Sequence, residues 1–90
     1  MSRDAKLDAL ANEIAQLRRE IQILEEQISF QEEVSGEASL RAIVSETPLA
    51  DREADEAGRD LERLKRVKAE AQRSLEHLSQ EVDKLLDEGR

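Results

Sequence analysis

Residues 45–48, Ser45-Glu46-Thr47-Pro48, separate two apolar patterns that mirror each other along the chain. Before this stretch, aliphatic side chains recur at alternating spacings of three and four, at Leu7, Leu10, Ile14, Leu17, Ile21, Leu24 and Ile28. After it, the same spacings recur at Leu61, Leu64, Leu75, Leu78, Val82 and Leu85. Such spacing is typical of helices that pack along a narrow seam. We therefore predict that two helices fold back on each other at residues 45–48.

One antiparallel alignment satisfies both patterns. If the turn is centred on residue 46, the numbers of facing residues add to 92, so that Leu7 faces Leu85 and Ile14 faces Leu78. We predict an all-α fold, an antiparallel two-helix coiled-coil hairpin that forms a single domain. The expected segments of residues 1–90 are a first arm at about residues 4–44, a tip at residues 45–47 and a second arm at about residues 48–87.

The residues of the turn favour the start of a new helix. Thr47 is a good N-cap, because its hydroxyl can accept a hydrogen bond from a backbone N–H of the first turn. Pro48 suits the first helical position, where its missing N–H is not needed, and it disfavours helical geometry at the preceding residue. The turn is therefore predicted from local chemistry as well as from the mirrored patterns.

The seam changes from large to small side chains toward the tip. Beyond Ile28 the same positions of the first arm hold Gln31, Ser35, Ala38 and Ala42. The corresponding positions of the second arm before Leu61 hold Ala50, Ala54 and Ala57. Small residues therefore face small residues, and we expect the two helices to approach each other closely there.

Two glycines lie nearly opposite each other at this level, Gly36 and Gly58, and each costs about 1 kcal/mol in a helix interior. They can form a hinge, or they can permit a tight crossing of the helices. An alternative fold breaks the first arm at Ser35-Gly36 and makes residues 37–45 a separate short helix, because Leu40, Ile43 and Val44 lie off the seam.

Charged residues beside the seam provide a test of the alignment. Glu25 and Lys65 are expected to meet across one edge of the hairpin. Lys68 occupies a seam position opposite Leu24, where its aliphatic stem can pack while its ammonium group reaches outward. A polar residue at such a position fixes the alignment at some cost in stability.

Composition excludes an ordinary globular core and argues against nucleic acid as a main partner. The 90 residues are 40% charged and contain one aromatic residue, Phe30, and the net charge is −8. Neither arm is basic, whereas duplex binding depends on clustered Lys and Arg. Without cysteine there is no disulfide and no thiolate metal site, and His77 has no second histidine beside it. We expect no cofactor.

Neither a catalytic constellation nor a membrane segment is apparent in the sequence. The seam holds no carboxylate or histidine, and no nucleophile triad or glycine-rich phosphate loop occurs. Nothing near the N-terminus resembles a signal peptide, and no apolar run approaches the roughly 18 residues of a membrane helix. We expect a cytoplasmic protein that is not an enzyme.

Residues near the turn form a candidate partner-binding tip. Four aliphatic side chains lie outside the seam, Leu40, Ile43, Val44 and Leu49, and they are called the tip surface below. Charged side chains lie beside them, namely Glu46, Asp51 and Arg52. Exposed aliphatics at the end of a long hairpin indicate a docking site for a partner protein. Alternatively, the four side chains close a small local core that caps the hairpin.

A second set of apolar residues lies on one flank of the first arm. Ile23, Phe30 and Val34, called the flank stripe below, are spaced seven and four apart and lie off the seam. A two-helix hairpin buries little surface, and short chains often gain stability by association. We expect a homodimer packed as a four-helix bundle through this stripe. A helix of a different protein is the alternative occupant.

Four arginines recur every seven residues on the outer face of the second arm, namely Arg52, Arg59, Arg66 and Arg73. They form either an anion-binding track or a solvated face on which Arg59 pairs with Asp55 and Arg66 with Glu62. Acidic residues four positions before arginines favour the paired interpretation.

In shape, a hairpin with acidic residues near its tip resembles the coiled-coil arm of bacterial transcript-cleavage factors, which is inserted into the secondary channel of RNA polymerase. The resemblance rests on Glu46, Asp51 and Glu53 and includes neither a matching tip motif nor the second domain of those factors. Two functions are therefore considered. The favoured one is a non-enzymatic scaffold or adaptor that acts through self-association and protein partners. The alternative is a regulator whose tip enters a large enzyme such as bacterial RNA polymerase.

Overall fold

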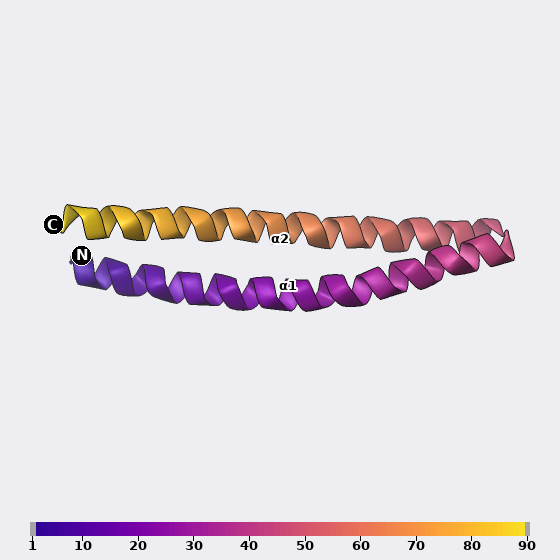
Figure 1. The fold of residues 1–90 in the computed structure, drawn as a ribbon, viewed down its shortest axis with the longest axis horizontal. Helices are drawn as coiled ribbons and strands as arrows, with labels where there is room; N and C mark the ends of the chain where they lie inside the picture. Colours follow the sequence, from indigo (N-terminus) through magenta and orange to yellow (C-terminus); the bar gives the residue numbers. More distant parts are fainter. Residues whose placement is uncertain (1, 90) are drawn as a thin grey trace.

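Two long helices account for nearly all of the chain. The computed structural model describes residues 2–89, with α1 at Arg3–Ser45 and α2 at Pro48–Glu88. Figure 1 shows the helices lying side by side in opposite directions, with both chain ends at the same end of the molecule. The Cα atoms span 66 × 17 × 15 Å, a length that matches 43 helical residues at about 1.5 Å each. The all-helical, hairpin-like arrangement predicted from the sequence is confirmed.

Side-chain hydroxyls cap the N-terminus of each helix. The Oγ atom of Ser2 accepts a hydrogen bond from the Ala5 N–H at 3.1 Å, and Oγ1 of Thr47 accepts one from the Ala50 N–H at 3.2 Å. Pro48 occupies the first helical position, as its lack of an N–H favours. The start of α2 is therefore determined by residues 47 and 48 themselves.

The turn consists of two residues, Glu46 and Thr47. Glu46 adopts the left-handed conformation, with φ 51° and ψ 38°, and its N–H donates to the Ala42 carbonyl at 3.1 Å. Thr47 is extended, with φ −113° and ψ 148°. The left-handed conformation costs a non-glycine residue about 1 kcal/mol, and glycine is the usual residue at such a helix end.

Helix α1 runs without a break through Ser35 and Gly36, so residues 37–45 are not a separate short helix. Figure 1 shows that α1 instead curves toward α2 as it approaches the tip. The curvature keeps Ala38 on the seam, where only 3% of its surface is exposed. Small side chains thus allow the close approach that the sequence predicts.

Every predicted seam position is buried or half-buried. The buried residues are Ile21, Ile28, Ala38, Ala50 and Ala57. Within residues 2–89, however, no large side chain is buried to less than 2% exposure. Two helices in contact therefore shield a stripe of each other but leave even the central aliphatics partly accessible.

The shape leaves much more surface in water than a compact fold would. The accessible surface is 6700 Å², whereas a compact protein of this mass exposes about 5,300 Å². The Cα radius of gyration is 19.9 Å, whereas about 12 Å is typical of a globular domain of this length. Stability must therefore come from a long, thin contact.

The structure rules out one of the two interpretations of the glycine pair. A Cβ atom built on Gly36 or Gly58 would meet nothing within 4 Å. The tight-crossing interpretation is therefore wrong, because neither position needs the absence of a side chain for the helices to approach. The hinge interpretation stays a prediction.

Replacing these glycines should stabilise the hairpin. We expect Gly36→Ala and Gly58→Ala each to raise the free energy of unfolding by about 0.5–1 kcal/mol, since alanine restricts the unfolded chain and favours helix. Urea denaturation followed by circular dichroism measures this change. A loss of stability in either variant would show that the helices close more tightly at this level than the structure indicates.

Candidate interaction surfaces

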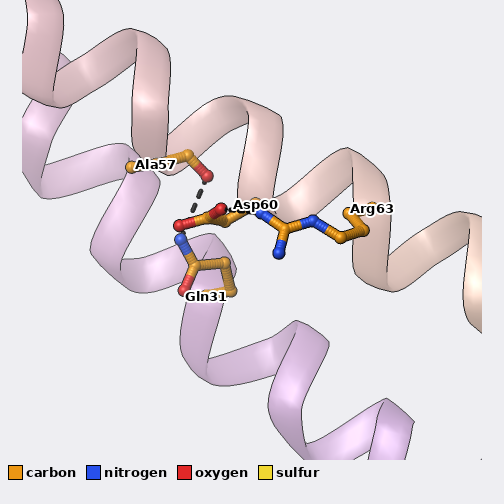
Figure 2. Close-up of polar contacts among 4 residues, drawn as sticks. All are labelled: Gln31, Ala57, Asp60 and Arg63. Carbon is orange, nitrogen blue, oxygen red and sulfur yellow. Dashed lines mark hydrogen bonds and ion pairs between the residues drawn. The ribbon is translucent and has the colours of Figure 1, made fainter.

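A hydrogen bond crosses the seam at the point where its side chains change from large to small. Gln31 extends from α1 and donates from Nε2 to the backbone carbonyl of Ala57 in α2 at 3.0 Å. Figure 2 shows Asp60 and Arg63 beside this contact on α2, where they form an ion pair. Gln31 is half-buried, and its amide is held at one point of the opposite backbone. The contact therefore favours one axial alignment of the helices.

The ion pair across the seam differs from the predicted one. Lys68 Nζ lies 3.6 Å from Glu25 Oε1, whereas Lys65 Nζ lies 3.9 Å from Glu62 Oε1 on its own helix. The expected contact between Glu25 and Lys65 is therefore wrong. Lys68, rather than Lys65, reaches Glu25 because the aliphatic stem of Lys68 lies between the helices, where 29% of its side chain is exposed. Its ammonium group therefore emerges beside Glu25.

The flank stripe is only partly shielded. Ile23 is 53% exposed and Phe30 66% exposed, while Val34 is half-buried. An open groove of about 460 Å³ lies beside Ile23 and Phe30 and reaches Leu64 of α2. A second groove, of about 320 Å³, lies beside Val34 and reaches Ala57. One side of the hairpin thus combines unpartnered apolar side chains with hollows between the helices.

The tip surface is open to solvent in all its members. Leu40 is 62% exposed, Ile43 73%, Val44 75% and Leu49 61%. The alternative in which these side chains close a local core is therefore wrong, because their positions on the outer faces of α1 and α2 direct them away from the seam. Glu46, Asp51 and Arg52, at the edge of this surface, are also exposed.

The ion pairs on α2 differ from the two that were expected for the arginine series, Arg59 with Asp55 and Arg66 with Glu62. Among residues 2–89, Asp60 pairs with Arg63, and Glu62 pairs with Lys65 rather than with Arg66. Nor do Arg59 and Asp55 pair in the part of the chain that the structure describes. A groove of about 860 Å³ contains Arg59, Arg63 and Arg66 but also four carboxylates, namely Asp55, Glu56, Asp60 and Glu62. This mixed lining does not favour an anion.

Neither a metal-binding cluster nor a membrane-spanning helix occurs within residues 2–89. Over residues 2–89, no three histidine, aspartate or glutamate side chains lie close enough together to hold a metal ion. Within the same range, neither α1 nor α2 has a stretch that is long and apolar enough to cross a membrane.

Comparisons with protein-family models, with curated proteins and with solved structures find no match.

Sequence reasoning placed Gln31 on the seam but missed its hydrogen bond. We expect Gln31→Leu to raise the free energy of unfolding by up to about 1 kcal/mol, because leucine continues the aliphatic seam and the Ala57 carbonyl already lies within a helix. Urea unfolding measures the change. The control Gln22→Leu, at an exposed position off both the seam and the flank stripe, should change it by less than about 0.5 kcal/mol. A clear loss in Gln31→Leu would contradict the expectation and give the hydrogen bond a larger role.

Proposed function

We propose that this chain is a non-enzymatic coiled-coil interaction module, a scaffold or adaptor that forms a homodimer packed as a four-helix bundle. The observation that carries the proposal is the exposure of Phe30, the one aromatic residue of the chain, at 66% beside Ile23 at 53%. Two large apolar side chains on the same flank of one helix are the usual contact points of a further helix layer.

The surface of the hairpin is large enough for such a dimer. Its accessible area of 6700 Å² exceeds the compact value by about 1,400 Å². A standard protein interface buries about 800 Å² on each partner. Complete burial of a Phe or Ile side chain contributes roughly 1.5–3 kcal/mol, so pairing two flank stripes supplies a substantial driving force.

The net charge of the hairpin near Phe30 also permits a second copy to pack there. Residues 25–33 carry four acidic and no basic side chains, whereas residues 59–68 carry five basic and two acidic ones. These segments lie opposite each other in the alignment and together carry a net charge of −1. A second copy can therefore pack here without strong repulsion between like charges.

Phe30→Glu should shift the chain from dimer to monomer. Because two Phe30 side chains are lost from each dimer and two charges are added, we expect at least a 100-fold rise in the dissociation constant. Analytical ultracentrifugation of the wild type and the variant measures the shift. The matched control is Gln22→Glu, which adds the same charge at an exposed position off the stripe and should remain dimeric. A wild type that is monomeric at several hundred micromolar would overturn the proposal.

A second candidate is a regulator whose hairpin tip enters a large enzyme such as bacterial RNA polymerase. The observation that favours it is the exposure of the tip surface, between 61% and 75% for its four members. Glu46 and Asp51 would be the carboxylates that reach a basic channel or a bound metal. This candidate replaces the first if the wild type binds purified RNA polymerase and a Leu40→Ser/Ile43→Ser/Leu49→Ser variant does not.

A further inference from the structure

We propose that the tip surface binds a basic amphipathic helix of a partner protein. The inference rests on the proposed role as an interaction module and specifies the chemistry of its partner. It starts from the aliphatic residues of the tip, since Leu40, Ile43 and Val44 are spaced three and four apart on the outer face of α1. Leu49 adds a fourth exposed aliphatic in the first turn of α2.

The geometry of the tip suits a helix rather than an extended peptide. All described residues around the turn are helical except Glu46 and Thr47, so no strand edge is present there to pair with a peptide backbone. Side chains spaced three and four apart on a helix form ridges that pack into the grooves of a second helix. An apolar helix face is therefore the complementary surface.

The charge of the tip specifies the rest of the partner. Residues 37–56 carry six acidic and two basic side chains, a net charge of −4, which is half of the −8 of the whole chain within 20 of its 90 residues. Carboxylates beside an apolar surface attract Lys and Arg at the edge of the partner face. The complement is a helix with one aliphatic face and basic flanks.

The same charge disfavours two other occupants. A second copy of the tip would bring two surfaces of net charge −4 together, so the dimer contact belongs at the nearly neutral flank stripe instead. A membrane with anionic headgroups would repel the tip for the same reason. A basic protein segment is the occupant that both the apolar and the charged components favour.

Glu46 places one of these carboxylates at the turn itself. It is exposed, and it occupies the left-handed position at the end of α1, where its φ is 51°. It therefore lies beside the aliphatic residues of the tip surface, where a basic side chain of the partner can reach it.

The test uses two labelled 18-residue model peptides with the same leucine face, one with lysine and one with glutamate on its polar face. Fluorescence anisotropy with the full chain should show binding of the Leu/Lys peptide and none of the Leu/Glu peptide. Leu40→Ser/Ile43→Ser should weaken the Leu/Lys complex at least tenfold. Glu37→Gln/Glu46→Gln/Asp51→Asn should weaken it and reduce its dependence on salt.

The control is Leu86→Ser, which removes an exposed aliphatic side chain at the other end of the hairpin, outside both the flank stripe and the tip surface, leaves the charge unchanged and should alter peptide affinity less than twofold. Equal weakening by the control and the tip variants would overturn the inference, as would absence of Leu/Lys binding or equal binding of the Leu/Glu peptide. Tip-dependent binding to phosphatidylserine vesicles would replace the protein helix with a lipid surface. Ultracentrifugation of the same samples distinguishes failure of the homodimer proposal from failure of the tip proposal. A wild type that is monomeric but binds the Leu/Lys peptide would contradict the homodimer and leave the binding of a basic helix at the tip supported.

Discussion

The contact between two long helices sets the limits of this structure. Each helix can shield only one stripe of the other, and the most buried large aliphatics, Ile21 and Ile28, are still 9% exposed. The large seam residues on either side of them are only half-buried. Because hydrophobic stabilisation grows with the area removed from water, a seam of this kind provides little per residue. The flank stripe lies where a further layer of helices would add to it.

Apolar surface and charge are distributed unevenly along the length of the hairpin. At the level of Phe30, acidic residues of α1 lie opposite basic residues of α2, and Lys68 pairs with Glu25 across the seam. Around the turn, carboxylates surround the exposed Leu40, Ile43 and Val44 instead. The two surfaces therefore differ in charge, which is the physical basis for assigning one to a second copy of the chain and the other to a basic partner.

The sequence predicted the backbone well because the relevant signals are local or periodic. The heptad spacing identified the seam, and Thr47 and Pro48 identified the start of α2. The individual polar contacts were not predictable, since Lys65 and Lys68 are long side chains that can both reach the same edge of the hairpin. The distance between the backbones of α1 and α2 could not be predicted from the sequence either. The sequence therefore did not show whether Gly36 forms a hinge or permits a tight crossing. The exposure of Leu40 was not predictable either, because the periodic pattern does not show whether another part of residues 2–89 covers the tip.

The concentration dependence of thermal unfolding tests most directly whether the hairpin depends on a second layer. If folding is coupled to dimerisation, the melting temperature should rise by about 4 °C for each tenfold increase in protein concentration, given the usual unfolding enthalpy for two chains of this length. Circular dichroism melts between a few micromolar and several hundred micromolar provide the measurement. A melting temperature that is the same across this range would contradict the account and show that the two-helix seam is sufficient by itself.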